Sequence, residues 1–443
     1  MITPLKKHCQ WIEPSIVAKH LINSFGESGF IWLDGDGSEN GRWVTLGVEP
    51  DEQICSRGLP GKENASNPFT LLRNLKPGHW TGWLSYEAGA WLEPKNSWKE
   101  DEMATLWMAS HDPIFKFDLH KKILWLEGCN QKRFNSFLKW LNNLSSNKFA
   151  NNDRNINKQR INIPIDKWQW ITQLDEYQKN VEAIKKLIEQ GDIFQANLSA
   201  CCKAKAPSPI LATDLYLQLK AKCPSPFSGI LVGAGESLGE AIISTSPERF
   251  LKVLPCGAVE SRPIKGTRPR DKNPLIDANL AADLICSPKD RAENIMIVDL
   301  LRNDLGKVCQ AGSINVNQLV GLESYSQVHH LTSVIQGKLK PNKTWVDLLE
   351  ASWPGGSITG APKLRACQRL YELEPIARGP YCGSFININW DGQVDSNILI
   401  RSLIIKDSCI RVHAGCGIVA DSNANNESEE LKWKLMPLLK SIV

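Results

Sequence analysis

A polar, asparagine-rich stretch constrains the fold most, because it divides the chain in two. It covers residues 145–157 and continues to Pro164. It lacks the apolar spacing of a helix or a strand, which is typical of a surface linker. Because the chain has 443 residues, enough remains on both sides for folded units. We therefore predict a first lobe at 1–145, a linker at 146–164 and a larger domain at 165–443.

The two sides of this stretch differ in their apolar patterns. Before it, short apolar runs such as 29–33 and 80–84 are interrupted by Gly and Pro, which predicts a β-rich lobe. After it, Tyr177, Val181 and Ile184 fall at helical spacing, and Gly191 is placed to end that helix. Further strands are predicted at 193–199, 241–245 and 258–262, and long helices at 288–305 and 425–439. Strands in groups with helices between them favour an α+β fold.

Charge and cysteine usage narrow the functional class. The 52 basic and 48 acidic residues leave a net charge of only +4, which argues against nucleic acid or a membrane surface as partner. No run of about 18 apolar residues is present, and the first eight residues lack an apolar signal core. The 13 cysteines form no CxxC pair and are expected to be reduced. We therefore expect a cytoplasmic protein.

Two of the predicted helices carry acidic faces. Asp290 and Glu293 are three residues apart and share one face, as do Glu427, Glu430 and Lys434 on the closing helix. Mg²⁺ is bound by one or two protein carboxylates together with substrate oxygens and waters, so the two helices could supply such a site. From spacing alone, ordinary solvated charged faces remain the alternative.

Two small-residue segments could hold an anion. Residues 355–363 are Gly-rich and precede a helix predicted to begin near Pro362, whose first N–H groups would face the segment. The segment is not a P-loop, because Ala361 and Pro362 follow its last glycine. A second predicted loop at 414–417 follows a strand and precedes the closing helix. Tight turns are the alternative for both.

A single lysine stands out in the segment 262–270. Lys265 follows a predicted strand and lies in an expected loop, between a proline-fixed turn and Gly266. A lysine in such a loop is usually solvated. If it were desolvated in a pocket, its amine would be a nucleophile. Composition does not decide between the two.

Six segments together resemble the signatures of the chorismate-binding enzymes. This family includes component I of anthranilate synthase, component I of aminodeoxychorismate synthase, and the isochorismate and salicylate synthases. The resemblance implies a large mixed two-lobed fold, with antiparallel sheets packed together, helices on the outside and residues 165–443 as the chorismate-binding catalytic domain. The segments follow the family order, from about residue 170 to 436: 194–199, 246–250, 290–294, 298–306, 355–363 and 417–422.

Within the family, Lys265 indicates the reaction. Sequences resembling aminodeoxychorismate synthase component I carry Pro-Ile-Lys-Gly-Thr, as at 263–267, where anthranilate synthases usually have Ala in place of the lysine. The resemblance implies that the lysine amine adds at C2 of chorismate and that ammonia then enters at C4. The product would be 4-amino-4-deoxychorismate, the precursor of 4-aminobenzoate for folate biosynthesis, made by covalent catalysis.

The resemblance also implies roles for other residues. Glu248 would be the general acid for the departing C4 hydroxyl, with His330 near that oxygen. Glu293 and Glu430 would bind Mg²⁺. Asp290 and Glu427 would be outer-shell partners of the metal. The residues expected to contact the substrate or to complete the anion cradle are Gln195, Thr267, Ser357, Arg401, Gly415, Gly417 and Lys434. Relatives that use water as the nucleophile tend to carry a lysine at the position of Gln195, where it activates the water. A glutamine at this position therefore fits an enzyme that uses ammonia.

The chain carries no activated-cysteine motif of a glutaminase. We therefore expect a separate glutamine amidotransferase subunit, component II, to supply ammonia. Three other functions stay open: anthranilate synthase component I, an isochorismate-forming enzyme, and a non-catalytic chorismate- or tryptophan-binding regulatory protein. The combination of Lys265 with the carboxylates argues against the last, because binding alone requires neither a nucleophile nor an acid.

Overall fold

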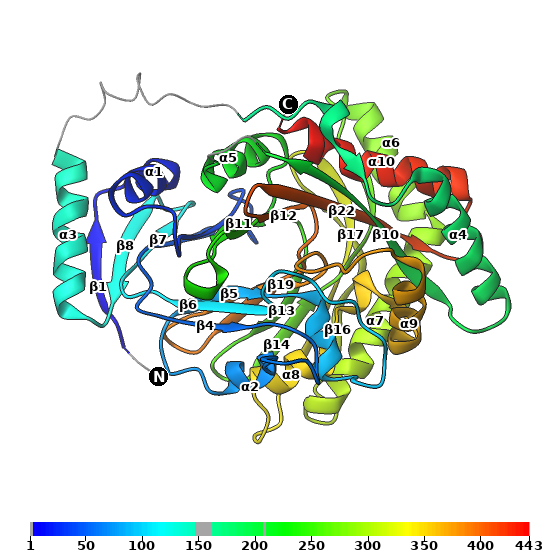
Figure 1. Ribbon diagram of the computed structural model, residues 1–443, viewed down its shortest axis with the longest axis horizontal. Coiled ribbons are helices and arrows are strands. Elements are labelled where there is room, and N and C mark those ends of the chain that lie inside the picture. Colours follow the sequence, from blue (N-terminus) through cyan, green and yellow to red (C-terminus); the bar gives the residue numbers. More distant parts are fainter. Residues whose placement is uncertain (1–2, 147–160, 207–209, 443) are drawn as a thin grey trace.

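The computed structural model describes residues 3–146, 161–206 and 210–442. Two large sheets face each other, and all their strand pairs are antiparallel (Figure 1). In spatial order the first sheet contains β1 (Leu5–Cys9), β8 (Ile123–Gly128), β7 (Ile114–Asp118), β3 (Trp43–Gly47), β2 (Ile31–Asp34), β11 (Phe227–Val232), β12 (Glu240–Ser246), β21 (Ser402–Lys406), β22 (Cys409–Ile418), β10 (Gln195–Lys205) and β18 (Gly360–Ala361), with β9 (Gln169–Trp170) beside β10.

The second sheet is equally continuous. Its strands in spatial order are β15 (Ile264–Pro269), β17 (Val328–Lys338), β14 (Ala258–Arg262), β13 (Arg249–Val253), β20 (Val394–Asn397), β19 (Ser384–Ile388), β5 (Trp80–Leu84), β6 (Leu106–Ser110) and β4 (Glu52–Ser56), with β16 (Asn315–Ser324) beside β17.

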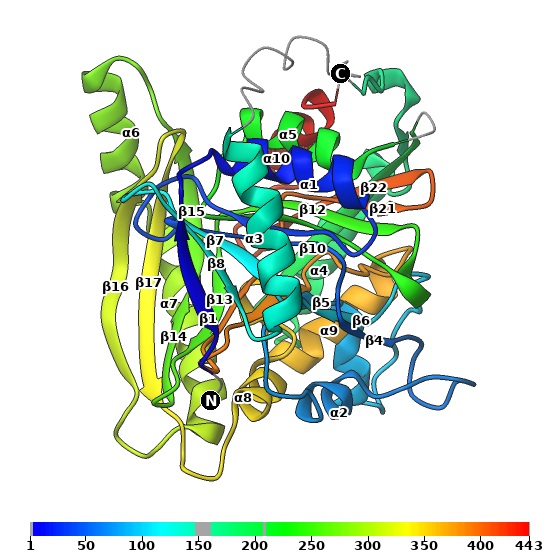
Figure 2. The ribbon, with the colours of Figure 1, turned by 90° about the vertical axis from the view of Figure 1, so that its left-hand side faces the viewer.

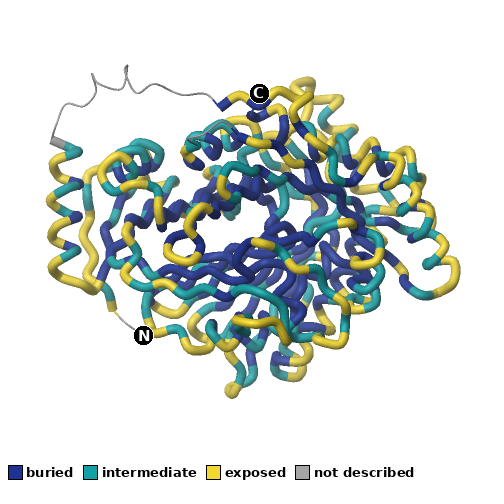
Figure 3. Tube along the Cα trace, in the orientation of Figure 1, coloured by how far each residue is buried: buried dark blue, intermediate teal, exposed yellow. Residues whose placement is uncertain are grey.

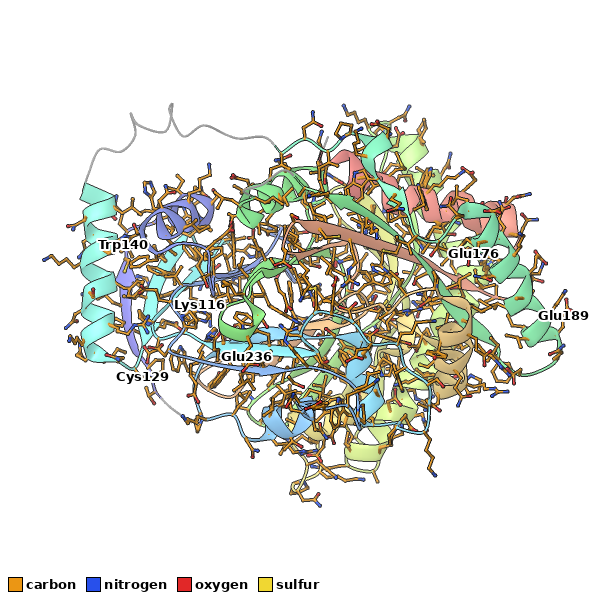
Figure 4. The ribbon with its side chains drawn as sticks, in the orientation of Figure 1. Lys116, Cys129, Trp140, Glu176, Glu189 and Glu236 are labelled. Carbon is orange, nitrogen blue, oxygen red and sulfur yellow. The ribbon has the colours of Figure 1, made fainter. Side chains whose placement is uncertain are left out.

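Helices cover the outside of these sheets, which confirms the predicted α+β class (Figures 1 and 2). Trp140 on α3 and Glu176 and Glu189 on α4 mark opposite ends of the long axis (Figure 4). The helices are α1 (Pro14–Phe25), α2 (Pro68–Arg73), α3 (Gln131–Ser146), α4 (Leu174–Glu189), α5 (Ala212–Lys222), α6 (Pro274–Cys286), α7 (Pro288–Val308), α8 (Trp345–Ser352), α9 (Lys363–Leu373) and α10 (Ala424–Lys440).

The core has two layers because neighbouring strand residues point to opposite faces of a sheet. On β11, Ile230 packs into the layer beneath the helices that cover the first sheet, whereas Leu231 packs into the layer between the two sheets. Ile243 and Ile242 on β12 divide in the same way. The strands are therefore apolar on both faces, and Figure 3 shows the buried strands inside and the exposed helices outside.

Both sheets contain strands from both sides of the predicted linker. In the first sheet β2 pairs with β11, and in the second β5 pairs with β19. Most of the linker at 146–164 lies outside the described residues. Its last part differs from the prediction of a surface segment: Ile161 and Ile163 are buried, and the Ile163 N–H donates to the Ile442 carbonyl. Two isoleucines that alternate with polar residues can bury one face. The division into lobes stays a prediction.

Local patterns predicted most elements well, and two predictions were wrong. The helix that Gly191 ends is α4, and the strand predicted at 258–262 is β14. The long helices predicted at 288–305 and 425–439 are α7 and α10. However, residues 414–417 lie inside β22, and Lys265 lies in β15, so neither segment is a loop. Small residues and glycines are compatible with a strand where a neighbour approaches closely.

No helix among the described residues combines the length and the apolarity needed to cross a membrane.

Candidate active site

Lys265 is brought close to helix α7 by the glycine that follows it. Strand β15 pairs with β17, and the register shifts between Lys265 and Thr267. Gly266 has a φ of +81°, and a Cβ built there would lie 2.9 Å from Asp290 Cβ. Only glycine combines this backbone conformation with so close an approach. The bulge therefore sets the position of Lys265 against α7.

The Lys265 amine meets two other predicted site residues. Its Nζ donates to the Ser357 carbonyl at 2.9 Å. Glu248, which follows β12, is 5% exposed, and burial raises its pKa to about 7, although the Ser357 side chain and the Lys265 charge both act to lower it. The candidate nucleophile and the candidate acid thus both contact Ser357.

Helices α7 and α10 contribute carboxylates to the same place. Burial raises the pKa of Glu293, and the charges of Lys265 and Lys289 oppose this shift. The ammonium of Lys434, 2.8 Å away, lowers the pKa of Glu430. The charge of Lys265 also lowers the pKa of Glu430, so the amine lies near carboxylates of both α7 and α10.

The two glycines of β22 leave space in this cluster. A Cβ at Gly417 would lie 2.4 Å from Gln195 Nε2 and 3.2 Å from Glu293 Oε2. The Gly415 carbonyl accepts a hydrogen bond from Lys434 Nζ at 2.9 Å. Glycine is therefore required at these two positions because a side chain would clash with its neighbours, and not because the backbone is left-handed.

Gln195 faces Glu293. Its Nε2 donates to Glu293 Oε2 at 3.5 Å, whereas its Oε1 is buried and has no partner among the described residues. An orphaned buried acceptor costs about 1–3 kcal/mol, so a ligand that donates to it would be favoured. Gln195 is thus placed to contact a bound molecule.

His330, Thr267 and Arg401 form a second group beside the first. Thr267 Oγ1 and His330 Nδ1 share a hydrogen bond of 2.9 Å, and His330 Nε2 is buried without a described partner. Burial, reinforced by the Arg401 charge, lowers the pKa of His330 to about 3 and keeps the ring neutral. Burial also lowers the pKa of Arg401, which has a φ of +52° and no ion pair with a described carboxylate. Strand β15 carries both Lys265 and Thr267 and so connects the two groups.

The two predicted outer-shell carboxylates have different surroundings. Asp290 lies 3.4 Å from Arg268 Nη2. Glu427 is 3% exposed and accepts from Ser422 Oγ at 2.7 Å and from Lys289 Nζ at 3.1 Å, while its Oε2 is buried without a described partner.

Lys289 was not predicted from the sequence. It lies four residues before Glu293 and therefore on the same helix face. This spacing was the feature of the sequence that could have predicted its place beside the carboxylates.

The carboxylate cluster suits a hard divalent cation. Glu293 and Glu430 offer oxygen ligands, and the Oε2 of Glu427 is buried without a described partner. Oxygen donors of this kind are those that Mg²⁺ prefers.

A large cavity lies apart from this site. It has a volume of about 1080 Å³ and is lined by residues of both sheets, Phe227, Ser228 and Asn397 among them. Arg249, which follows Glu248 in the chain, also lines it and pairs with Asp395. None of the predicted site residues lines this cavity.

Comparisons with known proteins agree with this geometry. The family model described as chorismate binding enzyme matches residues 31–440. An anthranilate synthase component I-like protein of a Synechocystis species is 35% identical over 368 residues, which cover 82% of this chain and 73% of that protein. Aminodeoxychorismate synthase component 1 of Salmonella typhimurium is 47% identical over 199 residues, which cover 45% of this chain and 44% of that protein.

A solved structure shares the fold. The crystal structure of anthranilate synthase component I from Streptococcus pneumoniae superposes with a TM-score of 0.75 at 28% identity, covering 91% of this chain and 93% of that chain. The fold similarity and the family match extend over both sheets. The chain therefore belongs to the family of chorismate binding enzymes, which makes it a chorismate-utilising enzyme.

Proposed function

We propose that the chain is component I of an aminodeoxychorismate synthase, a transferase that converts chorismate and ammonia to 4-amino-4-deoxychorismate through a covalent adduct of Lys265. The supporting observation is the hydrogen bond of 2.9 Å from the Lys265 amine to the Ser357 carbonyl, beside the buried Glu248. A substitution with a poor leaving group requires a nucleophile and an acid close together, and both of these groups contact Ser357.

The first step forms the bond between the Lys265 nitrogen and C2 of chorismate. The two conjugated ring double bonds shift from C1–C2 and C5–C6 to C1–C6 and C4–C5, and the C4–O bond breaks. Glu248 gives its proton to the departing hydroxyl, which leaves as water. Burial raises the pKa of Glu248 to about 7, so much of this carboxyl is protonated at neutral pH.

In the second step ammonia attacks C4. The double bonds return to C1–C2 and C5–C6, and the bond between C2 and the lysine nitrogen breaks, which regenerates the amine. Chorismate and ammonia are thus converted to 4-amino-4-deoxychorismate and water. Gln195 lies at the site, with an acceptor oxygen free to bind ammonia or a substrate hydroxyl.

The remaining site residues bind and orient the substrate. Arg401, a half-buried guanidinium without an ion pair among the described residues, would pair with a substrate carboxylate. His330, held by Thr267, would lie near the C4 oxygen as a neutral ring. Glu293 and Glu430 would bind Mg²⁺, which when bound offsets the charge of the ring carboxylate.

A separate glutaminase subunit is proposed as the source of ammonia, and a cytoplasmic location stays a prediction. The purified chain is expected to use ammonium salts but not glutamine. Turnover with glutamine by the chain alone would contradict the proposal of a separate subunit.

Anthranilate synthase component I is the second candidate, because relatives of that name match over most of the chain. The two functions differ in the carbon that receives nitrogen. The test is to incubate the chain with chorismate, Mg²⁺ and ammonium and to separate the products. Formation of 4-amino-4-deoxychorismate is expected, and direct appearance of fluorescent anthranilate as the main product would contradict it.

A further inference from the structure

Arg378 is a fully buried charge behind the candidate site. It is 2% exposed and lies between β10, α9 and the 3₁₀ helix Gly356–Ile358. Its guanidinium donates to both carboxylate oxygens of Glu374, at 2.9 and 2.7 Å. It also donates to the Ile358 carbonyl at 2.7 Å and to the Asn197 carbonyl at 2.6 Å. One side chain therefore joins three segments that are far apart in sequence.

The Glu374 carboxylate extends the connection to β10. Its Oε1 accepts hydrogen bonds from both the backbone N–H and the Oγ of Ser199 at 2.8 Å. The guanidinium also lies over the ring of Tyr86, 4.8 Å from its centroid. A buried ion pair is costly unless such additional hydrogen bonds satisfy both partners, and here they do.

Two of the segments held by Arg378, those at Ile358 and at Asn197, carry site residues. The Ile358 carbonyl is one residue beyond the Ser357 carbonyl that accepts from Lys265. Asn197 is two residues beyond Gln195 on β10, and its N–H donates to the Thr359 carbonyl. Fixing the Ile358 carbonyl fixes the peptide between Ile358 and Thr359, and this peptide shares the Ile358 Cα with the peptide that carries the Ser357 carbonyl, so it limits where that carbonyl points.

We propose that Arg378, through its fork of hydrogen bonds to Glu374, Ile358 and Asn197, is a positioning residue that holds the Ser357 carbonyl in the orientation that aims the Lys265 amine at the substrate. It touches Ser357 only through Ile358 and has no contact with Lys265 among the described interactions. This inference rests on the proposed function, because the group that it positions is the proposed nucleophile.

The test is Arg378→Lys, which keeps the charge but cannot bond a carboxylate and two carbonyls at once. A misplacement of about 1 Å can cost on the order of 100-fold in rate. We expect kcat per folded molecule to fall about tenfold or more, with the KM for chorismate within about twofold of wild type. The fraction of product aminated at C2 should rise, because a displaced lysine competes less well with ammonia.

The matched control is Arg42→Lys. Arg42 donates to both oxygens of the buried Asp118, in the outer part of the first sheet. This variant also replaces a fork by a single donor, so it should lower the thermal midpoint but leave kcat per folded molecule and the product ratio unchanged. If Arg378→Lys does not fold, Glu374→Gln loosens the same fork, and the same three results are expected of it.

Unchanged kcat and product ratio in a folded Arg378→Lys or Glu374→Gln protein would overturn this inference. An equal fall in kcat in the Arg42→Lys control would also overturn it, because the loss would then reflect general destabilisation. If wild type itself forms no 4-amino-4-deoxychorismate, the proposed function fails first, and the two failures are distinguished by the wild-type measurement.

Discussion

The ammonium of Lys265 is held by the carbonyl of Ser357 at 2.9 Å rather than by a carboxylate. The Ser357 carbonyl therefore sets the position of the Lys265 amine. Glu248 is close enough for the Lys265 charge to lower its pKa. This pair of contacts leads to predictions that solution experiments can check.

The first prediction concerns the pH dependence of turnover. The pKa of Glu248 is raised to about 7, so the protonated fraction of this carboxyl falls as the pH rises through that value. If it is the general acid, kcat/KM should fall on the alkaline side with an apparent pKa near 7. Glu248→Gln should lose about 100-fold or more in turnover and should lack this limb. A wild-type profile that stays flat up to pH 9 would contradict the role of Glu248.

The same shift predicts a change in stability. The folded carboxyl binds its proton more tightly than the unfolded one, whose ordinary pKa is 4.5, so folding stability is lost as the pH rises from 4.5 to about 7. Relative to wild type, Glu248→Gln should gain up to about 3 kcal/mol in the free energy of unfolding between pH 4.5 and pH 8. Urea unfolding at both pH values measures this. The exposed Glu236→Gln control (Figure 4) should gain nothing.

The second prediction concerns Mg²⁺. Glu430→Gln removes a proposed ligand and should weaken Mg²⁺ binding by about tenfold or more, as measured by calorimetry on the chain without substrate. Glu429→Gln is the matched control, since Glu429 is the exposed neighbour that pairs with Lys432. Equal Mg²⁺ affinity in the two variants would show that α10 does not bind the metal through Glu430.

The third prediction concerns the space left by Gly417. Because a Cβ there would come within 2.4 Å of Gln195 Nε2, Gly417→Ala should displace Gln195 and Glu293 and reduce kcat on the order of 100-fold. Gly306→Ala on α7 meets nothing within 4 Å and should keep full activity, with up to about 1 kcal/mol of added stability. Steady-state kinetics measures kcat of the Gly417→Ala and Gly306→Ala variants, and urea unfolding measures their stability. Full activity in Gly417→Ala would contradict the crowding.

The fourth prediction concerns Lys289. Its ammonium donates to Glu427 and lowers the pKa of Glu293. Its positive charge therefore lies close to the carboxylates proposed to surround the metal. Lys289→Met should relieve on the order of 1 kcal/mol of repulsion and tighten Mg²⁺ binding about fivefold. Lys432→Met on α10 is the control and should have no such effect. Weaker Mg²⁺ binding in Lys289→Met would mean that the lysine supports the site.

Local sequence patterns predicted the elements, because apolar spacing and capping residues act within a few turns. The span of α7 follows from Ser287 as N-cap and from Pro288, and that of α4 from its apolar face and Gly191. The carboxylate faces of α7 and α10 were predicted in the same way and lie in one cluster. The family resemblance added the roles of the residues, which the geometry alone does not test.

Long-range packing could not be predicted in this way. Nothing near Lys265 in sequence shows that β15 joins the edge of a sheet, because its partner β17 lies more than sixty residues further on. The fork of Arg378 joins segments separated by up to 181 residues. The pairing of β2 with β11 across the predicted linker is equally non-local. Each of these contacts depends on the whole fold.

The covalent role of Lys265 is tested most directly by peptide mass spectrometry. The chain would be mixed with chorismate and Mg²⁺ without ammonium, quenched, digested and mapped. We expect a mass increase of chorismate minus water on the peptide that contains Lys265, its loss when ammonium is added, and its absence in Lys265→Ala. Full formation of 4-amino-4-deoxychorismate by Lys265→Ala, with no adduct in wild type, would contradict the mechanism.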